Sequence, residues 1–172
     1  MPETGRLFIE CSVRRLGELI PRIETCLARL TPDQVWARGG DNENAVGNLV
    51  LHLCGNLRQW ILSGVGGTPG ARDRDAEFSA RGGVSPAELS ARLRQTANEA
   101  LAVIASLAPE QLAAPLVIQG YRVSCLEAVY HVVEHFSMHT GQILFATKML
   151  TGDDLGFYRH LTGNRPHSEQ TP

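Results

Sequence analysis

The sequence has few cysteines, and they are not clustered. Four occur in 172 residues, at Cys11, Cys26, Cys54 and Cys125, and no two of them form a CxxC pair. This spacing excludes a disulfide framework. It is typical of a reduced cytoplasmic protein in which each cysteine serves as a small buried apolar residue.

Long apolar runs and an excess of one charge are also missing. No stretch of about twenty apolar residues occurs, and the first residues do not resemble a secretory signal, so we expect no membrane partner. The net charge is −2, from 16 basic and 18 acidic residues interspersed along the chain. Because no basic stripe can neutralise a run of phosphates, we expect no nucleic-acid partner. These absences favour a cytoplasmic protein that acts on a small molecule.

Apolar residues recur at three- and four-residue spacing, whereas alternating strand patterns are nearly absent. The sequence therefore predicts an all-α protein. Four helices are expected, over residues 5–30 and 44–64, from the capping box "SPAE" onward, and from the capping box "SCLE" to about residue 150. A four-helix bundle with long inter-helix connections, forming one domain over residues 1–172, is the simplest way to bury their apolar faces.

Two connections in this scheme are long. The stretch "GVGGTPGARDRDAEFSARGG" has too many glycines for a core helix, and we interpret it as a loop with a function of its own. The stretch "APEQLAAPLVIQGYRV" is expected to be an extended connector that contains one short pair of strands.

Three histidines recur every four residues in the predicted fourth helix. They are His131, His135 and His139, within the segment "HVVEHFSMHTGQI". Helix positions four apart lie about 6 Å apart along the axis, so two imidazoles can reach one ion, whereas His131 and His139 lie about 12 Å apart. The helix can therefore offer His135 with one neighbour, and a third protein ligand must come from another helix.

The predicted second helix offers His52 as that ligand. His52 belongs to a polar ridge that recurs every four residues, made of Asn44, Asn48, His52, Asn56 and Trp60. A matching ridge on the fourth helix runs from Glu127 to His139. Burying amides and imidazoles without partners costs about 1–3 kcal/mol each, so facing polar ridges indicate a shared polar cavity.

A site of His52, His135 and one neighbouring histidine would leave one coordination position open, as catalytic metal sites do. The alternative is that these histidines are ordinary core groups that bond to carbonyls or carboxylates. The candidates for substrate binding are Asn48, Asn56, Arg58 and Arg72. Arg74 and Asp73 lie in the same loop as Arg72 and are also suited to a polar or anionic substrate, although a solvated charged loop explains them equally well.

A second motif overlaps these histidines. The residues from His131 to His135 match HxxEH, a zinc peptidase signature in which Glu134 would be the general base. That motif requires a further acidic ligand downstream, and only Asp153, Asp154 and Glu169 follow. Glu134 also lies about 100° around the helix from His135, so we do not favour this interpretation.

The segments "GNLVLHLCGNLRQW" and "HVVEHFSMHTGQI" together resemble the DinB-like superfamily of four-helix-bundle metalloproteins, which includes the DinB and YfiT groups. The likeness covers about residues 5–150 and includes the "RDRDAEF" loop. It implies that the metal ligands are His52, His135 and His139 and that the metal is a divalent ion such as zinc or nickel. His131 would then orient a ligand or a bound water, and Gln142 has a role in helix packing or in the site.

The resemblance also implies a range of activities. Some DinB-like proteins transfer low-molecular-weight thiols, and the resemblance is compatible with a homodimer. An open position on the metal would activate either a thiol, giving an S-transferase, or a water, giving a hydrolase. The alternative class is a non-catalytic metal-binding or stress-associated protein. No general base is evident beside the metal, and Glu127 is expected to serve the core or the helix cap.

Overall fold

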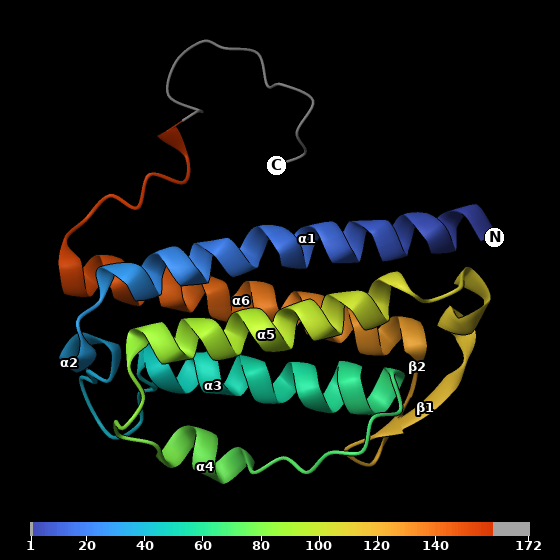
Figure 1. Cartoon of the computed structure of the whole chain (residues 1–172), viewed down its shortest axis with the longest axis horizontal. Coiled ribbons are helices and arrows are strands. Elements are labelled where there is room, and N and C mark those ends of the chain that lie inside the picture. Colours follow the sequence, from blue (N-terminus) through green and yellow to red (C-terminus); the bar gives the residue numbers. More distant parts are fainter. Residues whose placement is uncertain (1, 160–172) are drawn as a thin grey trace.

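The computed structural model describes residues 2–159, and most of them are helical. Long helical segments lie side by side along the molecule (Figure 1). They are α1 (Pro2–Arg29), α3 (Val46–Leu57) with its continuation η1 (Arg58–Val65), α5 (Pro86–Ala105) and α6 (Cys125–Thr151). The short elements are α2 (Pro32–Val35), α4 (Arg74–Ser79), η2 (Pro109–Ala113), β1 (Pro115–Ile118) and β2 (Tyr121–Ser124). The expectation of a helical protein is therefore confirmed, with one small antiparallel sheet added.

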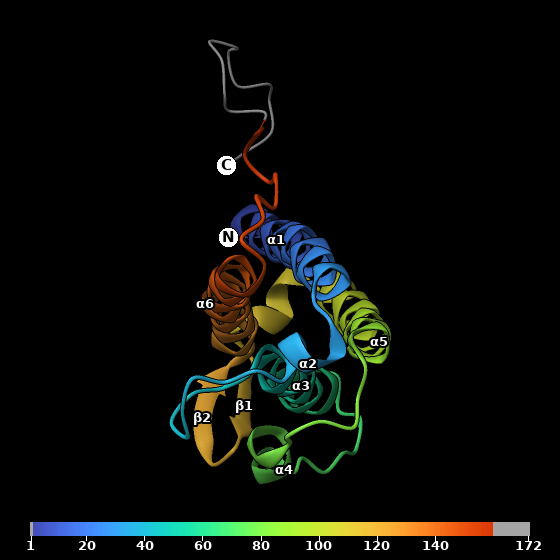
Figure 2. The same ribbon diagram turned by 90° about the vertical axis from the view of Figure 1, so that its left-hand side faces the viewer.

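The long helices surround a common apolar core. In the end-on view α1 and α3 lie on opposite sides of this core, with α5 and α6 between them (Figure 2). Accordingly α1 contacts α5 and α6, and α3 contacts the same two helices. Each helix contributes fully buried side chains, including Leu16 and Ile23 of α1, Leu53 of α3, Leu93 of α5 and Phe136 of α6. Burial of such side chains stabilises the fold by about 1.5–3 kcal/mol each.

The capping boxes read from the sequence form as expected. Ser85 and Ser124 begin α5 and α6, and each accepts a hydrogen bond from the backbone N–H of the glutamate three residues later. The fourth predicted helix ends at Thr151, close to the expected boundary. The first predicted helix begins three residues earlier than expected, at Pro2. The capping residues thus predicted the first residues of these helices well, because helix capping depends on neighbouring residues alone.

The predicted second helix changes its geometry halfway. It is α-helical to Leu57 and then continues as a π-helix over Arg58–Val65. The backbone N–H of Gly66 bonds to the carbonyl of Ile61, five residues earlier, at 2.7 Å. The π-helix was not predicted, because apolar spacing does not distinguish a local π segment from an α-helix.

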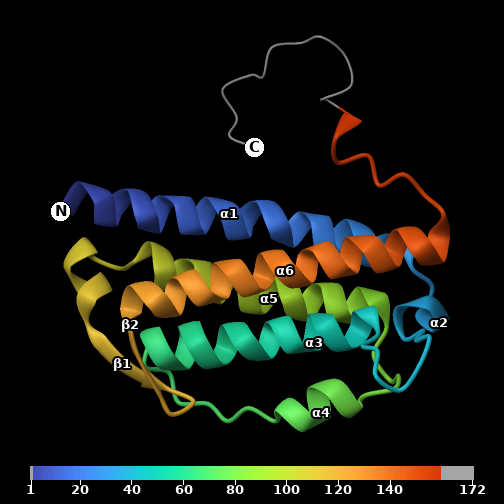
Figure 3. The same ribbon diagram turned by 180° about the vertical axis from the view of Figure 1, so that it is seen from behind.

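The long connections fold over one side of the molecule. The loop that follows η1 contains α4, which lies along α3 (Figure 1). The sequence prediction of a loop without a helix was therefore wrong for Arg74–Ser79. The predicted strand pair is confirmed, with Ile118 opposite Tyr121, and it lies near η1 and the start of α6 (Figure 3). No helix among residues 2–159 is long and apolar enough to cross a membrane.

Candidate metal site and its cavity

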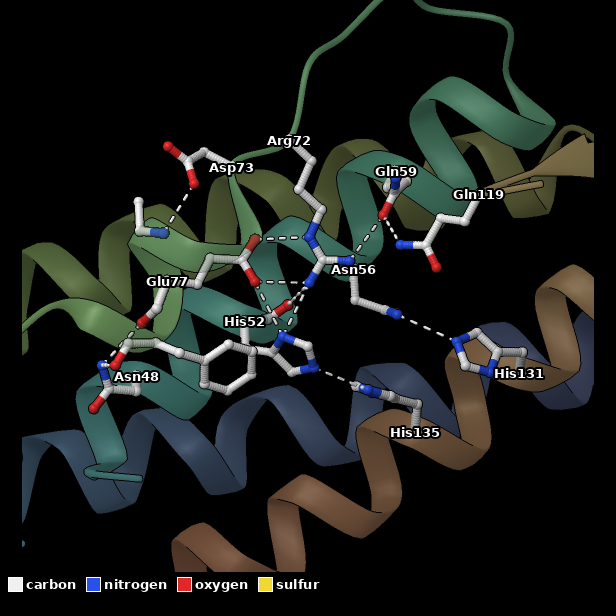
Figure 4. Close-up of polar contacts among 12 residues, drawn as sticks. Asn48, His52, Asn56, Gln59, Arg72, Asp73, Glu77, Gln119, His131 and His135 are labelled. Carbon is white, nitrogen blue, oxygen red and sulfur yellow. Dashed lines mark hydrogen bonds and ion pairs between the residues drawn. The ribbon is translucent and has the colours of Figure 1, made fainter. Parts of the chain in front are cut away.

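Histidines from α3 and α6 converge inside the molecule. The ligand atoms of His52, His135 and His139 all lie within 4.8 Å of one another. The Nε2 atoms of His52 and His135 are 3.1 Å apart (Figure 4). The ring centroids of His135 and His139 are 4.4 Å apart, and those of His52 and His139 are 5.1 Å apart. This group could hold a metal ion.

The geometry fits a single metal ion after a small side-chain adjustment. Zinc–nitrogen bonds of about 2.0–2.1 Å in a tetrahedral site place the ligand nitrogens about 3.3 Å from one another. The 3.1 Å between the Nε2 atoms of His52 and His135 is already close to this value. The largest separation of 4.8 Å requires the third imidazole to approach by more than an ångström, which side-chain rotation can provide.

His52 is oriented by an ion pair on its other side. Its Nδ1 lies 3.0 Å from Oε2 of Glu77, and Arg72 bonds to both carboxylate oxygens of Glu77 at 2.7 Å (Figure 4). Burial disfavours ionisation of Glu77, but hydrogen bonds from Arg72 and His52 outweigh it and hold the pKa of Glu77 below its usual range. Nδ1 of His52 has two partners of opposite kind, because the ionised Glu77 can only accept whereas Nη2 of Arg72, 2.9 Å away, can only donate. The tautomer that donates to Glu77 is the one that leaves the lone pair of Nε2 for a metal ion.

The other two histidines differ in how their Nδ1 atoms are used. Nδ1 of His139 lies 2.6 Å from Oε1 of Gln142, which accepts its hydrogen and leaves Nε2 as the basic nitrogen. Nδ1 of His135 is buried and has no hydrogen-bond partner among the described residues. Burial lowers the pKa of His135 to about 3 and also lowers the pKa of His139. Both imidazoles are therefore neutral near pH 7, which is the form that binds a metal.

His131 lies one turn away from this group and has different contacts. Its Nε2 is 3.3 Å from Nδ2 of Asn56, and its ring is 4.1 Å from the Trp60 ring, measured between centroids. The amide of Asn56 donates, so Nε2 of His131 accepts. Spacing alone left His131 and His139 as alternatives, and the group that converges on His52 contains His139 and not His131.

A cavity of about 510 Å³ opens beside the histidines. His52 and His135 line it together with Asn56 and His131, and its other lining residues are Trp60, Arg72, Arg74, Gln119, Tyr121, Arg122, Val123 and Glu127. A volume of this size is typical of small-molecule sites. The polar cavity inferred from the two ridges is thus present between α3 and α6.

Comparison with known proteins places the chain in a family. A family model described as a protein of unknown function, DUF1572, matches residues 3–164. The chain belongs to the DUF1572 family. Its description assigns no activity to this DUF1572 member, so the chemistry has to be argued from the site itself.

Two further similarities were found for this DUF1572 chain. A solved structure described as a conserved protein of a locus from Enterococcus faecalis has a TM-score of 0.71 and 16% identity, and the match covers 84% of this chain and 97% of that one. It shows that the fold is shared. The WASP homolog-associated protein with actin, membranes and microtubules of Homo sapiens is 32% identical in an alignment over 126 residues, and the match covers 63% of this chain. The match spans only 14% of the human protein.

The four residues predicted to bind substrate are separated in the structure of this DUF1572 member. Asn56 and Arg72 line the cavity. Asn48 does not, because its buried amide bonds to the carbonyls of Glu77 and Ala80 and so holds the chain around α4 against α3. Arg58 bonds to Oγ1 of Thr96 and lines a different cavity.

The acidic candidates are either exposed or used in ion pairs and helix caps. Glu134 is exposed and is not among the residues that line the cavity, and Asp153 pairs with Arg29 at 3.1 Å. The peptidase motif therefore lacks both its base and its acidic ligand within the described part of the chain. Asp73 caps α4 by accepting from Ala76, and Glu127 caps α6 while also lining the cavity.

Glu77 and the cavity-lining residues of the β1–β2 hairpin were not predicted from the sequence. Glu77 lies in α4, within the segment interpreted as a loop, and Gln119, Tyr121 and Arg122 lie in the strand connector. Their sequence signals were the length of both connections and, for Glu77, the "RDRDAEF" loop that belongs to the family resemblance, and neither shows which residues face the site.

Proposed function

We propose that this DUF1572 member binds one divalent metal ion, zinc or nickel, through His52, His135 and His139 and uses it in catalysis on a small molecule. The observation that carries the proposal is the convergence of these three imidazoles within 4.8 Å, from two helices far apart in the sequence. Three imidazole ligands with an open fourth position are typical of catalytic sites.

The contacts on the far side of the imidazoles support metal binding. Oε2 of Glu77 and Oε1 of Gln142 lie at Nδ1 of His52 and His139, and donation to these oxygens would leave Nε2 of both side chains for the metal ion. Metal-ligating histidines almost always have such a partner for their second nitrogen. A pair of basic imidazole nitrogens only 3.1 Å apart, as at His52 and His135, needs either a shared hydrogen or a shared cation between them.

The cavity favours a catalytic role over a structural one. A structural site is closed by four protein ligands, whereas His52 and His135 line a cavity of about 510 Å³. A divalent metal ion bound here would lower the pKa of a thiol or of a water, which leads to S-transfer or to hydrolysis, respectively. His131 and Asn56 lie beside the ligands and would position the reacting molecule.

The same proposal extends to the wider family and to assembly. The paired histidine motifs on α3 and α6 favour membership of the DinB-like four-helix-bundle superfamily, with a low-molecular-weight thiol as co-substrate. We propose one domain over residues 1–172 and a cytoplasmic location. Exposed apolar side chains on α6, among them Tyr130, Phe145 and Met149, favour a homodimer. Light scattering over a range of protein concentrations would test the dimer.

Metal analysis tests the ligand set. We expect protein purified without added metal to contain about one divalent ion per chain. The variants His52→Ala, His135→Ala and His139→Ala should each weaken metal affinity by more than about a hundredfold. The matched control is His131→Ala, from the same histidine series, which should keep its metal. Retention of stoichiometric metal in all three ligand variants would refute the site.

Activity assays separate the chemical classes. N-acetylcysteine with chlorodinitrobenzene reports S-transfer, and nitrophenyl acetate reports hydrolysis. We expect one of these rates to disappear on chelation and to return with zinc or nickel. If metal binds but neither rate depends on it, and chelation instead unfolds the protein, the ion is structural and the alternative of a non-catalytic metal-binding protein holds.

A further inference from the structure

The cavity mouth carries two positive charges that have no acidic partner. Arg74 and Arg122 both line the cavity, and neither forms an ion pair within residues 2–159. Arg74 instead lies over the Phe78 ring, with 4.8 Å between its Cζ and the ring centroid. Arg72, which lies deeper, is already neutralised by Glu77. A guanidinium without a carboxylate is free to bind an anionic ligand.

The charge balance of the cavity favours an anion. Among the described residues that line the cavity, the one carboxylate is that of Glu127. Hydrogen bonds from the backbone and hydroxyl of Ser124 hold the pKa of Glu127 below its usual range. Glu127 is therefore ionised but already bonded. Arg74 and Arg122 therefore outnumber Glu127 and leave a net positive mouth.

The wall that carries Arg122 is anchored to the rest of the site. Gln119 and Gly120 form the two-residue turn between β1 and β2, with φ values of 54° and 82°. Two-residue turns with positive φ at both positions match the right-handed twist of the strands that they join. The side-chain amide of Gln119 donates to Oε1 of Gln59, and the same oxygen accepts from Nη1 of Arg72 at 2.9 Å (Figure 4). This chain of bonds ties the hairpin to the Glu77 ion pair.

Apolar packing holds the same hairpin down. Ile118, which is buried, lies against Gly64 of the π-helix, where a side chain larger than hydrogen would collide with it. The hairpin cannot swing away without exposing Ile118 to water. The charge of Arg122 is therefore held beside the cavity in advance of binding, which lowers the entropic cost of recognition.

The cavity also offers a hydrogen-bond acceptor and an aromatic surface. Oδ1 of Asn56 is buried and has no partner among the described residues, while its Nδ2 is used by His131. A donor on a bound molecule would satisfy this oxygen. Trp60 and Tyr121 also line the cavity and provide aromatic surface for an apolar or planar body.

We infer that Arg74 and Arg122 recognise the oxyanion of a small molecule whose other end reaches the three histidines. The molecule is amphipathic, with a carboxylate or phosphate at the mouth and an apolar body that carries a hydrogen-bond donor for Asn56. The assignment of its reactive end rests on the proposed metal function, whereas the assignment of its anionic end does not. The two parts can therefore be tested separately.

Calorimetric titration of the metal-free protein with benzoate, phenyl phosphate and benzamide tests the anionic end. We expect benzoate or phenyl phosphate to bind and the neutral benzamide not to bind. Arg74→Gln and Arg122→Gln should each weaken binding by about fivefold to tenfold, less than the loss of a buried charge-assisted hydrogen bond, because both arginines are exposed. The better of the two anions identifies the carboxylate or the phosphate as the preferred group.

The matched control is Arg14→Gln, which removes an exposed guanidinium that lines another cavity. It should leave anion binding unchanged, and metal analysis of Arg74→Gln and Arg122→Gln should show an unchanged metal content. Equal binding of benzoate and benzamide, absence of saturable binding of both anions, or equal weakening by Arg14→Gln would overturn the inference. If anions bind as expected while no metal binds to the histidines, the inference stands and the proposed catalytic function fails.

Discussion

Glu77 determines which nitrogen of His52 is available. Its carboxylate accepts the Nδ1 hydrogen of His52 at 3.0 Å, and Arg72 holds the carboxylate through two hydrogen bonds of 2.7 Å. All three side chains are nearly excluded from water, with side-chain exposures of 6%, 10% and 8% for His52, Glu77 and Arg72. In such surroundings partners of fixed position set the direction of the imidazole, and the tautomer that donates to Glu77 leaves Nε2 for a metal ion, while Nη2 of Arg72 lies 2.9 Å from the same Nδ1.

Glu77→Gln should therefore weaken metal binding without unfolding the protein. The amide keeps the size of the side chain but loses the charge that fixes the His52 tautomer and pairs with Arg72. We expect zinc affinity to fall by about tenfold to a hundredfold, as is usual for residues that orient a metal ligand. Competition titration with a fluorescent chelator measures the affinity. Glu134→Gln, at an exposed position on α6, is the control and should bind zinc as the unaltered protein does.

The ligand candidates were predictable from the sequence because a helix repeats them on one face. His131, His135 and His139 follow a four-residue period, and His52 lies in a similar ridge. The choice between His131 and His139 was not predictable from spacing, since it depends on how far α3 is displaced along α6. Glu77 was not predictable either, because its place beside His52 depends on how the loop folds back over α3.

Elements rather than single residues shape the cavity. The π-helix η1 follows α3 without a break and carries Gln59 and Trp60, which bond to the loop arginine and line the cavity, respectively. Single π-helical turns within helices are frequent at functional sites because they redirect side chains locally. The sequence predicted the helix through this region, but the redirection follows from tertiary contacts that no periodicity records.

Gly55 allows α4 and its loop to approach α3. A Cβ at this position would collide with Oε1 of Glu77 and lie 2.8 Å from Nε of Arg72. Gly55→Ala should therefore push the Glu77–Arg72 pair away from His52. Because these are the ends of flexible side chains, we expect a modest loss of stability, within about 1 kcal/mol, and a loss of zinc affinity of about tenfold or more. Urea unfolding and chelator competition measure the two effects.

The same substitution at Gly17 in α1 provides the comparison. Apart from the helix's own neighbouring backbone, no atom of residues 2–159 lies within 4 Å of a Cβ added there, so alanine has only its helix propensity to contribute. We expect Gly17→Ala to raise the free energy of unfolding by about 0.5–1 kcal/mol and to leave zinc affinity unchanged. An unchanged zinc affinity in Gly55→Ala would show that the close approach of α4 does not support the metal site.

For the whole molecule, the apolar core fixes the relative position of α3 and α6 and so preforms a polar site. Leu53 follows His52 directly, and Phe136 follows His135, and both apolar side chains are fully inaccessible to water. Displacing either helix to relieve the histidines would expose these residues at about 1.5–3 kcal/mol each. The core thus tolerates a buried Nδ1 of His135 that has no hydrogen-bond partner within residues 2–159. The stability of the core thus keeps the imidazoles of His135 and His139 buried and neutral.

Acid should therefore destabilise the metal-free protein. Burial lowers the pKa of His135 to about 3 and also lowers the pKa values of His131 and His139. An unfolded chain would protonate them near pH 6.5, so below this value the unfolded state binds more protons than the folded state. The free energy of unfolding should be highest above about pH 6.5 and fall with acid, by about 1.4 kcal/mol per pH unit for each histidine that stays neutral in the fold.

Urea unfolding of the chelator-treated protein between about pH 7.5 and about pH 5 measures this slope, in a range above the titration of most carboxylates. His135→Leu removes one group that must remain neutral in the fold, so its slope should be smaller by about one proton. Ser137→Ala, at an exposed position two residues away, should keep the full slope. Identical slopes in the His135→Leu variant and the unaltered protein would mean that His135 becomes protonated within the fold, and the burial that holds it neutral would then not exist in solution.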